Sequence, residues 1–304
     1  MSKIAFIYPG QGAQAIGMGK DFYEKSPLSR TIFDQASEAV NLDLKKLCFE
    51  ENDLLDKTEY TQVAMVTACL AMTRAVESMG LHADMTAGLS LGEYCAIAVA
   101  GGMCDLDAIR TVRSRGIFME HAAPEGSGAM SAVLGMDAAV IEDVLNGREG
   151  VSIANYNCPG QIVITGAADA VGEAGDACKE AGAKRVVPLK VSGPFHSALL
   201  AEAGKKLKEA LEDVTIQPIT IPYLTNVTAD YVKDPADVKD YLVSQVSSSV
   251  RWQQTIERLI ADGAEEFVEI GPGRSLSGFM RKINREVTTC NIDKMEDFNK
   301  YVNR

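Results

Sequence analysis

The segment Gly88-Leu89-Ser90-Leu91-Gly92 carries the strongest chemical signal in the chain. It fits the pattern G-x-S-x-G, follows an apolar run at 84–89 that predicts a strand, and precedes a helix-like run at 93–100. A serine on a sharp turn between a strand and a helix is the arrangement of a nucleophile elbow. Free N–H groups at the start of the helix would favour negative charge there. Ser90 is therefore the candidate nucleophile, although a glycine-serine turn without chemistry fits the same five residues.

A serine nucleophile needs a base, and the chain has only 3 histidines. His82 is expected in the loop before the Ser90 strand, and His121 at the end of a helix, where a cation gains from the helix dipole. His196 lies just after a predicted inserted subdomain, and ligand sites are common at junctions between domains. His196 is the preferred base, and the structural alternatives are helix capping or a partly buried histidine whose hydrogen bonds are satisfied. No aspartate stands at an obvious strand end before it, so a backbone carbonyl is a possible orienting group.

The elements that must position these residues begin with four apolar runs that are far apart in the chain, at 4–8, 84–89, 219–224 and 266–270. A parallel strand with helices on both faces gives such a continuous run rather than an alternating one. Long helical patterns lie between the runs, for example at 61–79. This alternation of strands and helices predicts an α/β domain with a largely parallel sheet.

The middle of the chain has a different pattern. It predicts strands at 128–136, 151–155, 161–165 and 184–191, with helices at 137–146 and 168–181. The order βαββαβ is that of a ferredoxin-like unit. We therefore predict a ferredoxin-like subdomain at 126–192, inserted in an α/β-hydrolase-like parallel-sheet core that comprises 1–125 and 193–304.

Composition limits the classes of function. The chain has 304 residues and a formal net charge of −12, which argues against a nucleic-acid-binding protein but leaves room for a local arginine that holds an anion. The 7 cysteines are odd in number and none are spaced as C-x-x-C, so neither a disulfide framework nor a zinc site is expected. The N-terminus does not read as a signal peptide, and no apolar stretch is long enough to span a membrane. A cytoplasmic protein that does not bind membranes is expected.

Several motifs occur together in sequence order. They are Gly10-Gln11-Gly12-Ala13-Gln14, Ser90-Leu91-Gly92-Glu93-Tyr94, Arg115-Gly116, Asn155-Tyr156-Asn157-Cys158-Pro159-Gly160-Gln161, Pro194-Phe195-His196-Ser197 and Gly271-Pro272-Gly273. Over nearly the whole chain they resemble the malonyl-CoA:acyl carrier protein transacylases, an acyltransferase family of fatty acid synthesis. The resemblance implies that a malonyl group passes from malonyl-CoA to the phosphopantetheine thiol of acyl carrier protein through a malonyl-serine intermediate.

The resemblance also implies roles for individual residues. Ser90 attacks the thioester and His196 accepts its proton. The backbone N–H groups of Gln11 and Leu91 form the oxyanion hole. The backbone carbonyl of Gln245 accepts the ring proton of His196, in place of a triad acid. No cofactor and no metal is implied, because nucleophile, base and oxyanion donors suffice for thioester exchange.

Substrate binding is assigned by the same resemblance. Arg115 holds the free malonyl carboxylate, Asn155 lies near the substrate, and Phe195 leaves no room for the extra methyl group of methylmalonyl. From its helical pattern alone, Arg115 borders an apolar stripe and would extend its charged head into water. One position departs from the family, which usually has histidine where this chain has Leu89. That histidine is not the general base, so the departure concerns the hydrogen bonding of the elbow rather than the base.

Three other functions fit parts of the sequence. Gly10-x-Gly12-x-x-Ala15 fits a relaxed dinucleotide fingerprint, but the acid at the expected distance, Asp34, lies in a predicted helix rather than after a second strand. A serine thioesterase or hydrolase of the α/β-hydrolase type, which would pass the acyl group to water, is the main alternative. A non-catalytic module that binds carrier protein is the third, and an intact Ser90 and His196 speak against it.

The expected partners are malonyl-CoA and acyl carrier protein, and a monomer is expected. The carrier is acidic in this family, so docking on an acidic chain requires a local basic patch. The candidate residues for such a patch lie on one predicted helix and on the subdomain: Arg274, Arg281, Lys282 and Arg285, with Lys184 and Arg185. A solvated helix face is the alternative interpretation of these charges.

Overall fold

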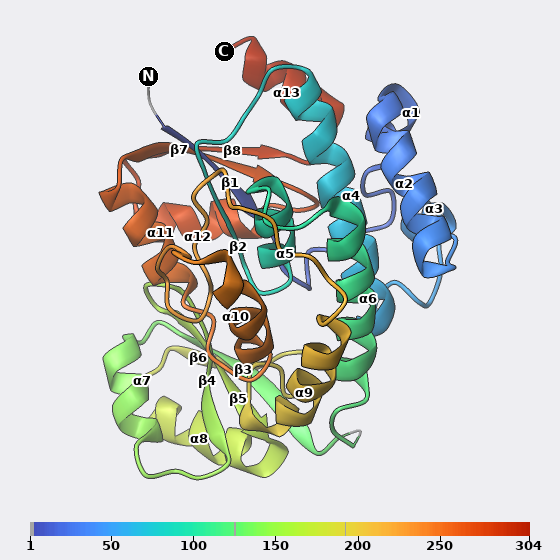
Figure 1. The fold of residues 1–304 in the computed structure, drawn as a ribbon. Helices are drawn as coiled ribbons and strands as arrows, with labels where there is room; N and C mark the ends of the chain where they lie inside the picture. The colour runs from blue at the N-terminus through green and yellow to red at the C-terminus, as the bar shows by residue number, and fades with distance from the viewer. Residues whose placement is uncertain (1–2, 125, 192) are drawn as a thin grey trace.

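A computed structural model describes residues 3–124, 126–191 and 193–304 (Figure 1). Residues 125 and 192, where the predicted boundaries between core and subdomain fall, lie outside the described residues, as do residues 1 and 2. The chain is a mixed α/β protein with one parallel and one antiparallel sheet, each of four strands. In Figure 1 the parallel sheet occupies the upper half of the molecule and the antiparallel sheet the lower half.

The parallel sheet has the strand order β2-β1-β7-β8. Its strands are β1 (Lys3–Tyr8), β2 (Met85–Gly88), β7 (Ala264–Ile270) and β8 (Thr288–Ile292). Alternate residues of β1 face opposite sides, as the period of a strand requires. Phe6 and Tyr8 pack in a cluster with helices α4 (Thr58–Ser78) and α6 (Asp105–Glu120), whereas Ala5 and Ile7 pack with α11 (Trp252–Ala261) and α12 (Ser275–Ile283). Cover on both faces explains why this strand is apolar throughout.

The apolar run at 219–224 does not form the predicted strand. It lies beside β2, but only Tyr223 makes a parallel bridge, to Thr86. Pro218 directly precedes the run and Pro222 interrupts it, and proline has no N–H to donate to a ladder. The N–H of Thr220 is instead bonded to the carbonyl of Ala100. The segment is therefore an irregular edge of the sheet, and it ends at Thr225 and Asn226.

The segment predicted as a subdomain has the predicted order of elements. These are β3 (Gly128–Leu134), α7 (Ala138–Leu145), β4 (Val151–Cys158), β5 (Gln161–Ala167), α8 (Ala168–Glu180) and β6 (Arg185–Pro188). The strands pair antiparallel in the order β4-β5-β3-β6. Strand β6 is shorter than the predicted 184–191. The segment has its own buried cluster between the sheet and its two helices, which includes Ile141, Ile164 and Val171.

The remaining helices pack mainly on other helices or at the edges of the two sheets (Figure 1). They are α1 (Lys20–Lys25), α2 (Pro27–Val40), α3 (Leu44–Phe49), α5 (Gly92–Val99), α9 (Ala201–Ala210), α10 (Val238–Gln245) and α13 (Met295–Val302), with short 3-10 turns at Ala198–Leu200 and Pro235–Asp237. Within the described residues, no helix is both long and apolar enough to cross a membrane. All 7 cysteines are free.

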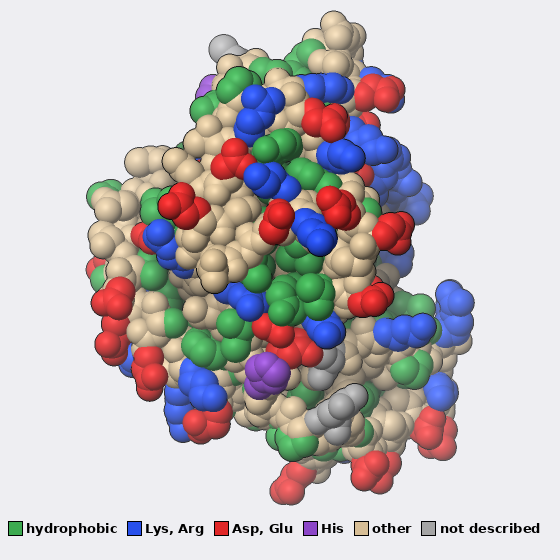
Figure 2. Space-filling view, turned by 90° about the vertical axis from the view of Figure 1, so that its right-hand side faces the viewer, with side chains coloured by type: hydrophobic (Ala, Val, Ile, Leu, Met, Phe, Trp, Pro, Cys, Tyr) green, Lys and Arg blue, Asp and Glu red, His purple; other side chains and the backbone are tan. Residues whose placement is uncertain are grey.

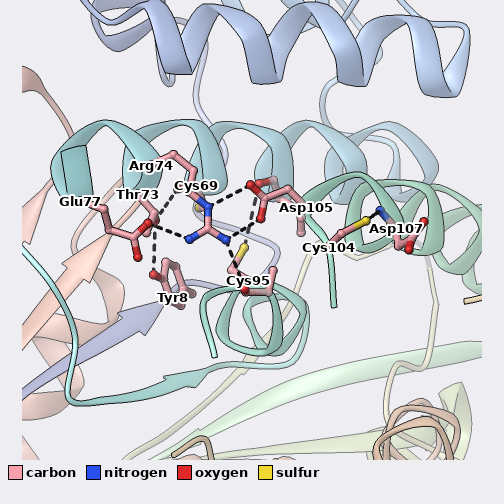
Figure 3. A network of polar contacts seen from close by, with 11 residues as sticks. Tyr8, Cys69, Thr73, Arg74, Glu77, Cys95, Cys104, Asp105 and Asp107 are labelled. Atoms are coloured by element: carbon pink, nitrogen blue, oxygen red, sulfur yellow. Dashed lines mark hydrogen bonds and ion pairs between the residues drawn. The ribbon is translucent and has the colours of Figure 1, made fainter. Parts of the chain in front are cut away.

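A polar network holds α4 against α5, which follows Ser90, and against α6, which carries Arg115 (Figure 3). Arg74 on α4 donates to both carboxylate oxygens of Asp105, at the start of α6, over 2.9 and 2.7 Å. The same guanidinium donates to Glu77 over 2.7 Å and to the carbonyl of Ala98, at the end of α5, over 3.2 Å. Bidentate pairs of this kind add geometric specificity as well as energy. The network therefore sets the relative positions of α4, α5 and α6.

Charge is well mixed on the side of the molecule that Figure 2 shows, which is the right-hand side in Figure 1. Basic and acidic side chains alternate across it, and hydrophobic side chains form small, separate patches. Small apolar patches are ordinary on a protein surface. Among the described residues that this view shows, hydrophobic side chains do not merge into one broad surface.

Candidate active site

Ser90 stands on the turn between β2 and α5, and its backbone is strained. Its φ is 50°, in the left-handed region that residues other than glycine rarely adopt. The two flanking glycines make the turn possible. A Cβ on Gly88 would lie 2.0 Å from the carbonyl carbon of Gly92, and a Cβ on Gly92 would lie 2.3 Å from the carbonyl oxygen of Tyr8. The glycines of G-x-S-x-G are thus required by close packing, and the strain at Ser90 is of the kind found at functional sites.

His196 lies against the serine. Its Nε2 is 2.8 Å from Ser90 Oγ, and its Nδ1 is 2.9 Å from the backbone carbonyl oxygen of Gln245, the last residue of α10. Because a carbonyl oxygen can only accept, Nδ1 carries the proton, and Nε2 is left to accept the hydroxyl proton of Ser90. His196 is also held at a positive φ, 61°. Serine, histidine and carbonyl form a chain in which a serine can lose its proton to a base.

The environment keeps His196 neutral. Burial lowers its pKa to about 4, and the positive charge of Arg115 acts in the same direction. A neutral imidazole is the form that can accept a proton. The other two histidines are exposed and lie outside the cleft, His82 between α4 and β2 and His121 at the end of α6.

The rate of serine acylation should therefore resist acid. Because the active form of His196 is the neutral one and its pKa is about 4, kcat/KM should fall tenfold per pH unit only below about pH 4. Single-turnover acylation of Ser90 after brief pH jumps measures this. An acidic limb near the ordinary imidazole value of about 6.5 would contradict the assignment. The experiment is repeated with Glu93→Gln, because burial raises the pKa of Glu93 to about 7. Titration of Glu93 could otherwise produce an acidic limb close to the ordinary imidazole value and be mistaken for that of His196.

Arg115 is not where its helical pattern alone places it. Its side chain does not extend into water but is buried, with 1% of the residue exposed. Nη2 donates to Ser90 Oγ over 3.2 Å and to Gln245 Oε1 over 3.0 Å, and Nη1 donates to Gln62 Oε1 over 2.7 Å. The prediction that its charged head would reach water was wrong, because residues of α4 and α10 cover the face of α6 that carries Arg115. A guanidinium so close to the nucleophile can hold an anionic group of a bound substrate.

The sequence did not predict a role for a set of buried polar residues that lie beneath the elbow. The side chain of Asn226 accepts from the N–H of Ser90 over 2.5 Å and donates to the carbonyl of Gly88 over 2.7 Å, so it spans the turn. Glu93 Oε2 accepts from the N–H of Asn226 over 3.1 Å and from Gln245 Nε2 over 2.6 Å. These residues are far apart in the sequence, and the only signal was a polar pair, Thr225-Asn226, after an apolar run.

A cleft of ≈ 850 Å³ opens at Ser90, between the two sheets. It brings together all the substrate and oxyanion residues predicted from the sequence: Gln11, Leu91, Arg115, Asn155 and Phe195. Gln245 does not line the cleft but lies fully buried behind Ser90 and Arg115. The opposite wall comes from Ser275, Leu276 and Phe279 of α12. Within the described chain, no group of three or more His, Cys, Asp or Glu side chains could hold a metal ion.

Comparison with known proteins assigns the family. A family model described as "Acyl transferase domain" matches residues 5–292. The chain belongs to this acyltransferase family. It is 46% identical over 301 residues to the malonyl CoA-acyl carrier protein transacylase of Bacillus subtilis, covering 97% of this chain and 95% of that protein. It is 40% identical over 300 residues to the protein of the same name from Escherichia coli K12, covering 97% of each.

Solved structures of relatives share the fold of this acyltransferase. The malonyl CoA-acyl carrier protein transacylase of Clostridium perfringens superposes with a TM-score of 0.96 at 38% identity, covering 99% of this chain and 96% of that one. A malonyl-transacylase solved in complex with a type II PKS acyl-carrier protein superposes with a TM-score of 0.94 at 36% identity, covering 99% of both chains. The arrangement of the parallel and antiparallel sheets is therefore that of known malonyl-transacylases.

Leu89, the departure from the family pattern, leaves the backbone of the elbow connected to β1. Its N–H donates to the carbonyl of Tyr8 over 3.0 Å. Its side chain lines the cleft and packs closely on the loop after β1, since a Cβ on Gly10 would lie 2.8 Å from Leu89 Cδ2. In this acyltransferase, leucine fills the space beside the nucleophile with apolar volume and takes no part in the Ser90–His196 pair.

Proposed function

We propose that this acyltransferase moves a malonyl group from malonyl-CoA to the phosphopantetheine thiol of acyl carrier protein, supplying extender units for fatty acid synthesis. One observation carries the choice of acyl group. Arg115 is buried, lies 3.2 Å from Ser90 Oγ and, among the described residues, donates hydrogen bonds only to uncharged groups. A buried, unneutralised cation is costly unless an anion pairs with it. The free carboxylate of a malonyl group attached to Ser90 would supply that anion.

The reaction takes two half-steps through one serine ester. Ser90 Oγ attacks the thioester carbon as its proton passes to His196 Nε2, and the carbon–sulfur bond breaks as coenzyme A leaves with that proton. The thiol of the carrier then gives its proton to His196 and attacks the malonyl ester, and Ser90 recovers a proton from His196. The carbonyl of Gln245 keeps the imidazole in the tautomer that both steps need.

The remaining predicted residues fit around these steps. The backbone N–H groups of Gln11 and Leu91 are proposed as the oxyanion donors, because both residues line the cleft beside Ser90. Asn155 and Phe195 are proposed to bind and limit the acyl chain. Both are buried in the cleft wall, Asn155 on β4 and Phe195 directly before His196.

The products distinguish this proposal from a serine hydrolase. The enzyme is mixed with malonyl-CoA and either the carrier with phosphopantetheine or the same carrier without it, and the products are measured by mass spectrometry. Transfer predicts malonyl-carrier only with the first carrier and little free malonate with either. Free malonate at an equal rate with both carriers would favour the hydrolase.

We also propose a division of the fold for this function. Residues 1–125 and 193–304 would form an α/β-hydrolase-like core that carries Ser90, His196 and Arg115. Residues 126–192 would form a ferredoxin-like subdomain, a proposal that the strand order β4-β5-β3-β6 supports, and Asn155 is its contribution to the cleft. The monomeric state and the cytoplasmic location expected from the sequence stay predictions.

A basic patch on α12 is the proposed docking site for the acidic carrier. Within the described residues, Arg274, Arg281, Lys282 and Arg285 are all exposed and none of them forms an ion pair with a carboxylate. Lys282 Nζ reaches across to Gln161 of the subdomain over 3.3 Å. Because Leu276 and Phe279 of the same helix line the cleft, a carrier held here would present its thiol near the cleft mouth.

Reversing charge in this patch should separate the two half-reactions. Arg281→Glu, Lys282→Glu and Arg285→Glu together should lower kcat/KM for the carrier by about 10- to 100-fold, with an effect that shrinks as salt is raised. Malonylation of Ser90 by malonyl-CoA should change much less. The matched control reverses three exposed lysines on α9: Lys205, Lys206 and Lys208. Equal effects of both triple variants on the carrier reaction would sink the assignment.

A further inference from the structure

Every described hydrogen-bond acceptor of Arg115 is uncharged. Gln62 Oε1 accepts from Nη1, and Gln245 Oε1 and Ser90 Oγ accept from Nη2. Within the described residues, no carboxylate oxygen lies within 4.0 Å of an Arg115 nitrogen, the distance that defines an ion pair. Its Nε has no hydrogen-bond partner there. Buried arginines in proteins are usually paired with a carboxylate. Here the pairing is absent although Glu93 is buried nearby, behind Gln245.

The amide of Gln245 separates the buried carboxyl group of Glu93 from the buried guanidinium of Arg115. Its Nε2 donates to Glu93 Oε2 over 2.6 Å and to the carbonyl oxygen of Ser90 over 3.0 Å. Because both of these acceptors lie on the Nε2 side of the Gln245 amide, its oxygen Oε1 faces Arg115. Glu93 therefore orients the amide without touching the guanidinium. The carboxyl group of Glu93 is held one residue away from Arg115.

Gln62 acts from the other side with the same chemistry. It projects from α4 and is 1% exposed, and it lines the cleft. The one hydrogen bond that its Nε2 makes within the described part of the chain is to a methionine sulfur, Sδ of Met119, at 3.5 Å. Its amide oxygen therefore faces Arg115. A carboxylate would fit in the same volume and would pair directly with Nη1, yet the chain has the amide.

We propose that Gln62 and Gln245 are specificity-determining residues, which hold Arg115 through neutral amide oxygens so that its charge stays available for the free carboxylate of the acyl group. The inference rests on the proposed malonyl transfer. A carboxylate at either position would neutralise Arg115 before substrate binds, and the substrate carboxylate would then have to compete with a resident one. Neutral acceptors fix the guanidinium in place without a resident carboxylate that the substrate would have to displace.

Gln62→Glu is the sharpest test, because it adds a charge and loses only the weak contact to Met119. Wild type and variant are each mixed with malonyl-CoA or with acetyl-CoA, which lacks the free carboxylate, and acylation of Ser90 is followed by intact-protein mass. The ratio of kcat/KM for malonyl over acetyl should fall by about 100-fold in Gln62→Glu. The matched control, Gln62→Met, removes the hydrogen bond without adding charge, and its ratio should fall by about 10-fold or less.

The outcomes are separable from the proposed function itself. If wild type forms no malonyl-serine, the function is wrong. If wild type does form it, an unchanged ratio in Gln62→Glu, or an equal fall in Gln62→Glu and Gln62→Met, overturns the inference about the amides. Labelling of Ser90 by a neutral fluorophosphonate shows that each variant retains its site.

A charge exchange provides a second arm if Gln62→Glu does not fold. Glu93→Gln with Gln245→Glu keeps one buried carboxylate and one amide but brings the carboxylate into contact with Arg115. The malonyl-to-acetyl ratio of this double variant should also fall by about 100-fold. A ratio equal to that of wild type would overturn the inference, because the position of the charge would then have no effect.

Discussion

His196→Ala should lower the rate of malonyl transfer by a factor of about 10⁴ to 10⁶, the range seen when a nucleophile–base pair loses one member. The geometry gives the reason. His196 Nε2 is the described base 2.8 Å from Ser90 Oγ, and its pKa of about 4 keeps it ready to accept a proton at neutral pH. Transfer to carrier protein is measured under single-turnover conditions, so that product release does not mask the chemical step.

Two controls make this result specific. His82→Ala and His121→Ala remove exposed histidines outside the cleft, and their rates should stay close to that of wild type. Because serine and histidine act as a unit, Ser90→Ala combined with His196→Ala should be hardly slower than either single change. Losses that multiply in the double variant would mean that the two residues act independently, which the geometry does not allow.

Arg115→Met should lower kcat/KM for malonyl-CoA by about 10³-fold, as expected when one partner of a desolvated charge pair is removed. The guanidinium is buried beside Ser90, and no carboxylate of the described residues forms an ion pair with it. Its removal would leave the substrate carboxylate without a partner. Acetyl-CoA has no carboxylate to hold, and its kcat/KM should change far less. Steady-state kinetics with both thioesters give the comparison.

Arg110→Met is the matched control on the same helix. Its side chain is half exposed, at 53%, and makes only a surface ion pair with Asp107. It should leave the preference for malonyl-CoA as it is. If Arg115→Met reduced reaction with malonyl-CoA and acetyl-CoA equally, Arg115 would act on the nucleophile or on folding rather than on the malonyl carboxylate.

Much of the fold could be predicted because its strands are buried on both faces. β1 reads as a continuous apolar run over 4–8, β2 and β7 were indicated by similar short runs that end at glycine turns, and the alternation of elements at 128–188 was regular enough to give their order. β8 was missed because it is a half-exposed edge strand without a strong apolar pattern. The prediction of a strand at 219–224 was wrong because it rested on hydrophobicity and did not take into account that Pro222 has no N–H to donate to a strand ladder.

Some site residues could be predicted from their neighbours in the sequence, whereas others depend on contacts with distant parts of the chain. Ser90 could be predicted because a glycine-flanked turn is written in five consecutive residues. Arg115 could not be placed from its own helix, since its burial depends on α4 and α10 closing over it. Asn226 is 136 residues from the Ser90 N–H that it accepts from, and no local pattern reveals such a contact. The side-chain roles of Gln62 and Gln245 depend in the same way on distant partners.

The mass of the intact enzyme after mixing with malonyl-CoA alone tests the central claim most directly, since a malonyl-Ser90 intermediate must form before any carrier is present. We predict one malonyl-sized adduct, located on the peptide that contains Ser90, absent in Ser90→Ala and discharged when carrier protein with phosphopantetheine is added. Turnover to malonyl-carrier with no adduct on Ser90, or an adduct that persists in Ser90→Ala, would contradict the account.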